Sequence, residues 1–299
     1  MPDFHLQPLQ PETRLRFDPH AQRTSPVLSA HALSAHLLWQ DHFAFRWTET
    51  PDHFLLFAEY DRCVYMPLPP VGAPDRACVA ACFDWMDQRN PNRAISRIEN
   101  IAETDADFYR SMGFIVEPKL PEYVYRRTAL ANLKGDAYKT PRWACNAFAR
   151  RYNPTDRPYN RSDRPAAEAL LEAWAHARMR THADAIYRQM LCDAFSAHRR
   201  ALVEFDRLGL IGWVIEAQGA LAGYTFGFPL NRDTFCVALE VADPSKQGAA
   251  PYLFRAFART LTDSAWVNTM DDADIANLRR VKTSYRPSHK EGCYLARWP

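Results

Sequence analysis

The sequence predicts an α/β protein made of two similar halves, each a mixed, mostly antiparallel sheet flanked by helices. Two observations support this prediction. In both halves of the 299-residue chain, strand-like runs with alternating apolar positions are interleaved with stretches of helical spacing. Between the halves, residues 152–165 (YNPTDRPYNRSDRP) are rich in Pro, Asn, Asp and Arg, which is typical of a linker. We therefore expect one domain over residues 1–155 and a second over residues 156–299.

The first half is expected to contain a short helix at 28–40, followed by a β-β-β-α-β-α-β order. Residues 42–47 and 53–60 read as strands around a turn, and two prolines end a third strand at 63–70. Helical spacing of Val79, Phe83 and Met86 predicts a helix at 75–87. The remaining expected elements are a strand at 94–101, a helix at 105–112 that Gly113 ends, and two strand-like pieces in 114–127.

The second half is expected to repeat this plan. Ser162 can cap a helix at 166–177, with Pro165 in its first turn, and a second helix follows at 184–199. Residues 212–241 read as three strands joined by turns at 218–219 and 231–233. The order then continues with a helix at 251–261, a strand at 265–268, a helix at 272–282 and a final strand at 294–298.

Composition and charge narrow the class of protein. The formal net charge of +2 gives no whole-molecule argument for nucleic-acid binding. No apolar run is long enough to predict a transmembrane helix, and the N-terminal residues lack the apolar core of a signal peptide. The seven cysteines are odd in number and contain no CxxC pair, so we expect reduced thiols and a cytoplasmic protein without a metal site.

Residues 266–287 (WVNTMDDADIANLRRVKTSYRP) concentrate polar side chains at an expected strand-to-helix junction. Such junctions are common places for binding and catalytic groups in α/β proteins. We expect Asp272 in the first turn of the helix, with Arg279 and Lys282 further along the same face. The alternative is structural: acids at a helix start and cations in its last turn complement the helix dipole, and Tyr285 packs in the core.

Three segments resemble the DUF2156 family, which is typified by the C-terminal domain of phosphatidylglycerol lysyltransferase. The similarity covers about residues 90–290. In the first segment the matching residues are Glu122, Tyr123, Tyr125, Leu130, Leu133, Gly135, Tyr138, Arg142, Asn146 and Phe148. In the last segment they are Asn268, Asp272, Leu278, Arg279, Lys282, Ser284, Tyr285 and Pro287. Between these segments, Glu240 and Ala242 match a two-strand stretch.

The resemblance implies two tandem GNAT-like (acyl-CoA N-acyltransferase-like) domains, an architecture shared with the Fem aminoacyltransferases, with the active site in the second domain. It also implies transfer of an aminoacyl group from aminoacyl-tRNA to an amine or hydroxyl of a lipid or small molecule, with charged tRNA as co-substrate and no other cofactor. The chain departs from the family pattern in having Pro141 and Val241 in place of lysines, and Asp274 and Asn277 in place of glycines.

Aminoacyl transfer needs groups that hold the α-ammonium, deprotonate the acceptor and stabilise the oxyanion. Carboxylates suit the ammonium, Lys282 or Arg279 could face the carbonyl oxygen, and Tyr285 could donate to the leaving oxygen. On this basis the expected catalytic residues are Asp272, Lys282 and Tyr285. The expected substrate-binding residues are Glu240, Asn268, Arg279, Tyr138, Arg142 and Tyr252. Arg142 lies on a basic helix with Lys139, Arg150 and Arg151 that could contact phosphates, or could simply be a solvated face.

Two other classes of protein remain open from the sequence. A CoA-dependent N-acyltransferase would hold the CoA pyrophosphate on a glycine-rich loop that enters a helix. The candidate loop, residues 242–254, has one glycine, Gly248, and loses a donor at Pro251. A catalytically inactive ligand-binding relative is the other class. An open helix N-terminus at Gly248 would favour CoA, and a filled one would disfavour it.

Overall fold

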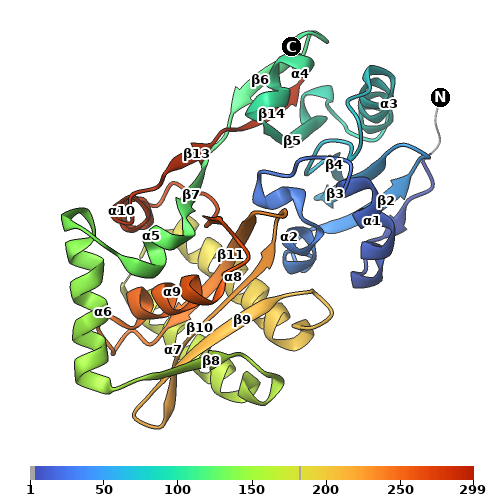
Figure 1. Ribbon diagram of the computed structural model, residues 1–299. Helices are drawn as coiled ribbons and strands as arrows, with labels where there is room; N and C mark the ends of the chain where they lie inside the picture. Colours follow the sequence, from blue (N-terminus) through green and yellow to red (C-terminus); the bar gives the residue numbers. More distant parts are fainter. Residues whose placement is uncertain (1–3, 182) are drawn as a thin grey trace. The chain divides into compact units, whose positions relative to one another are not determined.

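The computed structural model describes residues 4–181 and 183–299 and has the predicted mixed α/β fold (Figure 1). Its backbone divides into two compact units. Unit 1 consists of Met1–Glu122 and Glu291–Pro299, and unit 2 of Tyr123–Lys290. Within the described ranges, no helix combines the length and apolar character needed to cross a membrane.

Unit 1 is built on an antiparallel meander, a helix and a strand that runs parallel to the last strand of the meander. Met66, directly after the meander, bridges Ile98 in parallel, and helix α3 makes the crossover between them. The strands are β1 (Gln7–Pro8), β2 (Ala44–Glu49), β3 (Phe54–Tyr60), β4 (Cys63–Tyr65), β5 (Arg97–Ala102), β6 (Ile115–Pro118) and β14 (Cys293–Arg297). The α-helices are α1 (Arg14–Ala21), α2 (Leu33–Leu38), α3 (Arg76–Asp87) and α4 (Ala106–Arg110).

The sequence of α3 explains why this helix forms and where it packs. The Asp75 carboxylate accepts a hydrogen bond from the Ala77 N–H at 2.8 Å, which caps the helix start. Val79, Phe83 and Met86 are at most 2% exposed and join one apolar cluster with the sheet. Burying such side chains stabilises the fold by about 1.5–3 kcal/mol each. The helical spacing in the sequence therefore predicted the buried face correctly.

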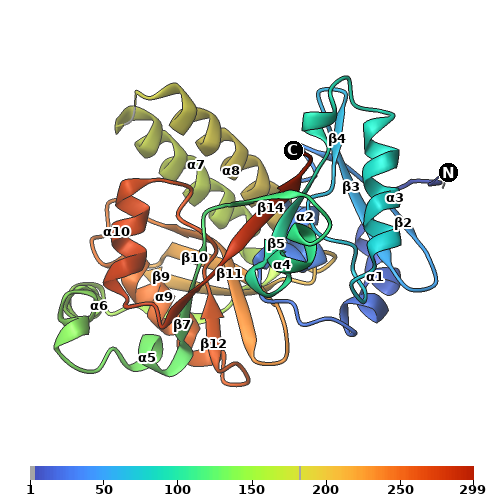
Figure 2. The same cartoon turned by 90° about the horizontal axis from the view of Figure 1, so that it is seen from above.

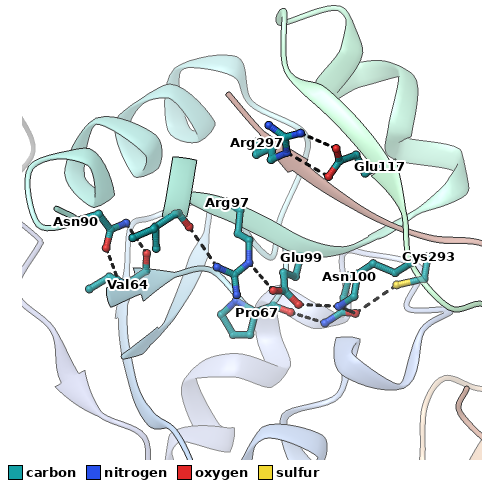
Figure 3. Close-up of polar contacts among 11 residues, drawn as sticks. Val64, Pro67, Asn90, Arg97, Glu99, Asn100, Glu117, Cys293 and Arg297 are labelled. Carbon is teal, nitrogen blue, oxygen red and sulfur yellow. Dashed lines mark hydrogen bonds and ion pairs between the residues drawn. The ribbon is translucent and has the colours of Figure 1, made fainter. Parts of the chain in front are cut away.

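A bulge in β5 organises the polar interior of unit 1 (Figure 3). Asn100 has a φ of 54°, and its amide donates to the Pro67 carbonyl at 2.8 Å. The amide oxygen accepts from Lys119 Nζ at 3.0 Å and from Cys293 Sγ at 3.3 Å. One side chain thus links the end of the meander to both neighbouring segments of the β5 sheet.

Unit 2 has the same plan on a larger sheet. An antiparallel meander, β9–β10–β11, is followed by helix α9 and by β12, which pairs with β11 in parallel. The strands are β7 (Glu122–Arg126), β8 (Thr155–Pro158), β9 (Ile211–Ala217), β10 (Ala220–Pro229), β11 (Thr234–Ala242), β12 (Trp266–Asn268) and β13 (His289–Glu291). The α-helices are α5 (Arg127–Asn132), α6 (Lys139–Tyr152), α7 (Arg164–Thr181), α8 (Ala185–Glu204), α9 (Ala249–Thr260) and α10 (Ala276–Ser284).

Helices cover both faces of this sheet. Figure 2 shows α7 and α8 on one side of β9–β11 and α9 on the other. On the α9 side, Phe148 of α6 and Leu253 of α9 pack with Ile215 of β9 in a buried cluster. On the α8 side, Tyr224 is fully buried, and its hydroxyl oxygen lies 3.0 Å from Nδ1 of His198. Burial lowers the pKa of His198 to about 3, so this histidine is a neutral core residue.

Two strands belong to a unit other than the one next to them in sequence. β14, the end of the chain, pairs with β5 and β6 of unit 1. β7, which follows the unit 1 elements in sequence, pairs with β12 and is bordered by β13 in the seven-stranded sheet. The order β5-β14-β6 in unit 1 therefore corresponds to the order β12-β7-β13 in unit 2, with β14 and β7 in the middle position. The predicted strand at 294–298 exists, but it belongs to unit 1 and not to the second domain.

The predicted boundary at residue 155 also differs from the division of the structure. Residues 155–158 form β8, the edge strand of the unit 2 sheet, and α6 packs against α9 of the same unit. The polar linker-like composition reflects ion pairs: Arg157 binds Asp163 at 2.7 Å and also Glu216. The basic helix α6 is therefore part of unit 2.

Several element boundaries differ from expectation. The helix expected at 28–40 is shorter, and α1, β1 and α5 lie in stretches where no element was predicted. The helix expected from residue 272 begins at Ala276. Ala273 and Asp274 have left-handed φ angles of 50° and 55°, and a helix cannot run through two such residues. Asp272 consequently lies in the loop before α10, and not in its first turn.

Candidate active site

The loop between β12 and α10 is held in shape by its own polar side chains. Asn268, which is fully buried, accepts the Met270 N–H at 2.7 Å. Asp271 accepts the Ala273 N–H at 2.7 Å, and Asp272 accepts the Asp274 N–H at 3.0 Å. Each bond closes a turn of the kind that Asn and Asp side chains form with the backbone two residues on. Asn268 therefore shapes this loop through its side chain.

Asp272 is 4% exposed, and both oxygens of its carboxylate accept hydrogen bonds. It accepts from the Tyr123 hydroxyl at 2.6 Å and from Arg279 at 2.9 Å and 3.2 Å. Hydrogen bonds from Arg279 outweigh burial and lower the pKa of Asp272 to about 2. Arg279 also pairs with Asp274. Asp272 is thus ionised at neutral pH, and its oxygens hold Arg279 and Tyr123, which is a positioning role.

Two lysines flank the Tyr123 ring. Lys290 Nζ donates to the Tyr123 hydroxyl at 3.2 Å and lies 4.4 Å from the ring centroid. Lys282 Nζ lies 5.6 Å from the same centroid and donates to the carbonyls of Thr269 and, at 3.2 Å, Met270. Tyr123 and Lys290 were not among the predicted site residues. Tyr123 had a signal in the sequence, because it is part of the Glu-Tyr-Val-Tyr match.

Glu240 on β11 is an ionisable group of this site whose pKa is strongly raised. Its residue is partly exposed, and among residues 4–181 and 183–299 its carboxylate has no hydrogen-bond donor. Burial by the surrounding protein raises the pKa of Glu240 to about 8, and the charge of Lys282 opposes this rise only in part. A carboxylate that is surrounded by protein normally accepts hydrogen bonds, so a partly exposed one without a donor is a candidate to bind a ligand.

Tyr285 lies beside Glu240 and contributes to the core as well. Its ring is 7% exposed and packs edge-on against Phe254 at 5.1 Å. Burial, followed by the charge of Glu240, raises the pKa of the Tyr285 hydroxyl well above its ordinary value. The hydroxyl therefore stays protonated at neutral pH and keeps its proton available for donation.

The predicted site residues form two groups. Glu240, Asn268, Asp272, Arg279, Lys282 and Tyr285 come together around β11, β12 and α10. Tyr138, Arg142 and Tyr252 belong to the layer of α5, α6 and α9. Arg142 donates to the carbonyls of Leu133 and Gly135 at 2.6 Å and 2.7 Å. The Tyr252 hydroxyl donates to Asp156 at 3.4 Å, and Tyr138 packs on the apolar cluster beneath α9.

The start of α9 is covered by α6. Gly248 has a φ of 90°, and a Cβ added to it would lie 2.6 Å from the Ala144 carbonyl oxygen and 3.0 Å from Phe148 Cβ. The glycine is thus required by the close approach of two helices, and the space beside it is filled. A phosphate cradle would need that space open.

Two surface hollows are lined by other residues of the chain. One of about 460 Å³ is lined by residues of α1 and of the β2–β3 turn, and one of about 310 Å³ lies between α7 and α8. Neither is lined by a predicted site residue. Within the described ranges, no group of three His, Cys, Asp or Glu side chains could hold a metal ion.

Residues 23–297 match the model of the family described as phosphatidylglycerol lysyltransferase, C-terminal. The chain belongs to this family, as its motifs indicated. No curated protein matches the chain.

Solved structures share the fold over the whole chain. A conserved protein of unknown function from Bacteroides thetaiotaomicron has a TM-score of 0.90 at 21% identity, covering 99% of this chain and 100% of its own. The C-terminal domain (DUF2156) of a putative lysylphosphatidylglycerol synthetase from Agrobacterium fabrum has a TM-score of 0.68 at 15% identity, covering 97% and 93%. FemX has a TM-score of 0.60 at 9% identity, covering 98% and 95%. The expected likeness to Fem proteins is therefore confirmed at the level of the fold.

Proposed function

We propose that this protein transfers an aminoacyl group from aminoacyl-tRNA to an amine or hydroxyl of a lipid or small-molecule acceptor. Membership of the phosphatidylglycerol lysyltransferase C-terminal family supports the reaction class. The observation that carries the proposal is Glu240, an unpaired carboxylate beside a lysine and a protonated tyrosine. Every aminoacyl ester carries an α-ammonium group, which is a cation that the Glu240 carboxylate could bind.

Glu240 is suited to hold that α-ammonium. With the site empty its pKa of about 8 keeps the carboxyl mostly protonated at neutral pH. A bound ammonium would stabilise the carboxylate form and lower this pKa, so the ion pair forms only when substrate is present. Asp272, which is already bound by Arg279 and Tyr123, is left to position those two side chains.

The chemical step requires no covalent intermediate with the protein. The acceptor nitrogen or oxygen attacks the ester carbonyl carbon and forms the new bond, and the bond to the ribose oxygen breaks. Tyr285 donates its hydroxyl proton to the ribose oxygen and takes up the proton that the acceptor loses, so that the tyrosine ends the step unchanged. The Lys282 charge, close to Glu240, stabilises negative charge on the carbonyl oxygen as it develops.

We propose further that the two units are tandem GNAT-type domains whose last strands are exchanged. The support is their shared plan: a meander, a crossover helix, a parallel strand, and a strand from the other repeat inserted next to it. We favour an RNA ester over a CoA thioester as donor because α6 fills the space beside Gly248. The cytoplasm, where charged tRNA is found, remains the expected location.

The test is transfer of labelled amino acid from charged tRNA to total lipid and to small amines by the purified protein. Label should move to an acceptor, and ribonuclease treatment should abolish the movement. Glu240→Gln should reduce transfer by at least about a hundredfold, which is the loss of a buried charged contact of roughly 3 kcal/mol. Glu172→Gln, which changes an exposed glutamate of α7, is the matched control and should transfer normally.

Three outcomes would contradict the proposal in different ways. Transfer from acyl-CoA, but not from charged tRNA, would move the protein to the CoA class. Binding of an aminoacyl analogue that depends on Glu240, without any transfer, would identify an inactive ligand-binding relative. Equal transfer by the wild-type protein and Glu240→Gln would remove Glu240 from the site.

A further inference from the structure

Helix α6 presents an exposed stripe that combines positive charge with an unpartnered aromatic ring. Residues 139–152 contain four cations and no acid. Lys139, Trp143, Asn146 and Arg150 are all exposed, and their spacing of four, three and four residues places them on one face of the helix. A stripe of this kind is unusual for a solvated helix, which normally carries charges of both signs.

Trp143 is the residue that a solvated helix face does not explain. It is 59% exposed. Within residues 4–181 and 183–299, no aromatic ring stacks on it and no cation lies over it. Tryptophan is the largest side chain that can stack on a nucleobase, and exposed tryptophans are enriched where a partner binds.

Three arginines meet next to this stripe without a carboxylate. Arg255 and Arg259 of α9 both donate to the Ala131 carbonyl at 3.1 Å, and Arg142 of α6 donates to Leu133 and Gly135. No aspartate or glutamate of the described chain pairs with any of the three. Burial, and next the charge of Arg259, lowers the pKa of Arg255. The positive charges of Arg255 and Arg259 are therefore close enough to repel each other.

The backbone does not balance this charge. The carbonyls belong to the end of the short helix α5 and to the residues directly after it, Leu133 and Gly135. A helix C-terminus carries only a partial negative charge, which does not neutralise three guanidinium groups. Each guanidinium has five N–H donors, and the carbonyls use only some of them. A fixed, unneutralised array of this kind matches the oxygens of phosphate groups.

We propose that α6 and the Arg142–Arg255–Arg259 cluster bind the single-stranded 3′ end of the RNA donor, with phosphates at the arginines and a base stacked on Trp143. This inference rests on the proposed function, since it gives the RNA of the aminoacyl ester its contact surface. An anionic membrane is the competing partner. RNA is favoured because the carbonyls hold the guanidinium groups in place, and because Trp143 is the one apolar side chain in the exposed stripe.

The test measures binding of a fluorescent single-stranded RNA ending in CCA by anisotropy, over a series of salt concentrations. Trp143→Ala should weaken binding about tenfold, because stacking on an aromatic contributes roughly 1–3 kcal/mol per base. Trp143→Phe should retain most of the affinity. Arg150→Gln and Arg255→Gln should each weaken binding and lower the salt slope by about 1. Arg199→Gln, on the exposed side of α8, is the control and should bind normally.

Arg255→Gln loses its carbonyl contacts, so thermal melting is measured for every variant. The Trp143 and Arg150 variants change exposed side chains only and should melt like the wild type. Wild-type RNA affinity in Trp143→Ala would overturn the proposal. So would a loss of binding to phosphatidylglycerol vesicles, with RNA binding unchanged, which would assign the stripe to a membrane.

Failure of this inference can be told apart from failure of the proposed function. If the α6 variants bind RNA weakly but the wild type transfers no amino acid, the RNA surface stands and the transferase proposal falls. If ribonuclease-sensitive transfer proceeds with an unchanged KM for charged tRNA in Trp143→Ala, the transferase proposal stands and the α6 surface is wrong.

Discussion

The Asp272 carboxylate receives two hydrogen bonds from Arg279, one from Nε at 2.9 Å and one from Nη2 at 3.2 Å, while its backbone carbonyl accepts the Ile275 N–H at 2.8 Å. The pair therefore joins the loop after β12 to the middle of α10. The Asp272 side chain is 6% exposed and that of Arg279 is 46% exposed, so the aspartate end of the pair is buried while the arginine end reaches solvent.

Asp272→Asn should destabilise the protein by about 2 kcal/mol at neutral pH, since it removes the buried anion that accepts from both Arg279 and the Tyr123 hydroxyl. The pKa of Asp272 is lowered from 3.8 to about 2, so this stabilisation is present above pH 4 and is lost as the pH falls towards 2. Urea unfolding at pH 7 and at low pH measures both. An equal difference between wild type and variant at the two pH values would contradict the ion-pair argument.

Asp274→Gly should be no less stable than the wild type. Asp274 has a φ of 55°, a conformation that costs a non-glycine residue about 1 kcal/mol and costs glycine little. The ion pair that it makes with Arg279 is 78% exposed on the aspartate side and contributes little. Asp274→Val is the contrasting variant and should melt at a lower temperature. A large loss of stability in the glycine variant would show that the Arg279 contact matters more than the backbone strain.

The same position explains one departure from the family pattern. The resemblance predicted a glycine after the aspartate, and the structure retains the left-handed backbone that favours glycine. An aspartate is among the few other residues that tolerate this conformation, so the loop shape survives the substitution. Local sequence could predict the loop residues, but it could not predict that the acids lie before the helix.

Pairing between distant segments is what the sequence could not supply. The alternation in residues 294–298 predicted a strand, but it contains no information on its partners, which are β5 and β6. Tyr123 and Asp272 are 149 residues apart, and no spacing rule joins them. The edge strand β8 has a polar composition because Arg157, Asp156 and Thr155 face ion pairs or solvent, so it read as a linker. By contrast, elements with strong apolar periodicity, such as α3 and β11, were predicted well.

Gly248→Ala should destabilise the protein by more than 2 kcal/mol, because the new methyl group would meet the Ala144 carbonyl oxygen at 2.6 Å and the φ of 90° is unfavourable for alanine. Gly219→Ala is the matched control. Gly219 has a φ of 75° and open space around its Cα, so its substitution should cost about 1 kcal/mol from the backbone alone. Chemical denaturation measures both variants. Equal losses would mean that α6 and the start of α9 are less tightly packed than the structure indicates.

Glu240→Gln should stabilise the empty protein while it removes transfer activity. The folded-state pKa of Glu240 is raised from 4.5 to about 8, so between these values the unfolded chain is ionised and the folded site is not. Stability is therefore lost as the pH rises from 4.5 to 8, and a glutamine that cannot ionise avoids this loss. Because the residue is partly exposed, we expect a gain of about 2 kcal/mol at pH 7 and almost none at pH 4.

Thermal melting of both proteins across this pH range gives the comparison, with Glu172→Gln as the control that should follow the wild type. A variant that is less stable than the wild type at pH 7 would mean that Glu240 already has a partner in the folded protein. A more stable but inactive variant is the behaviour expected of a residue retained for binding at a cost to stability.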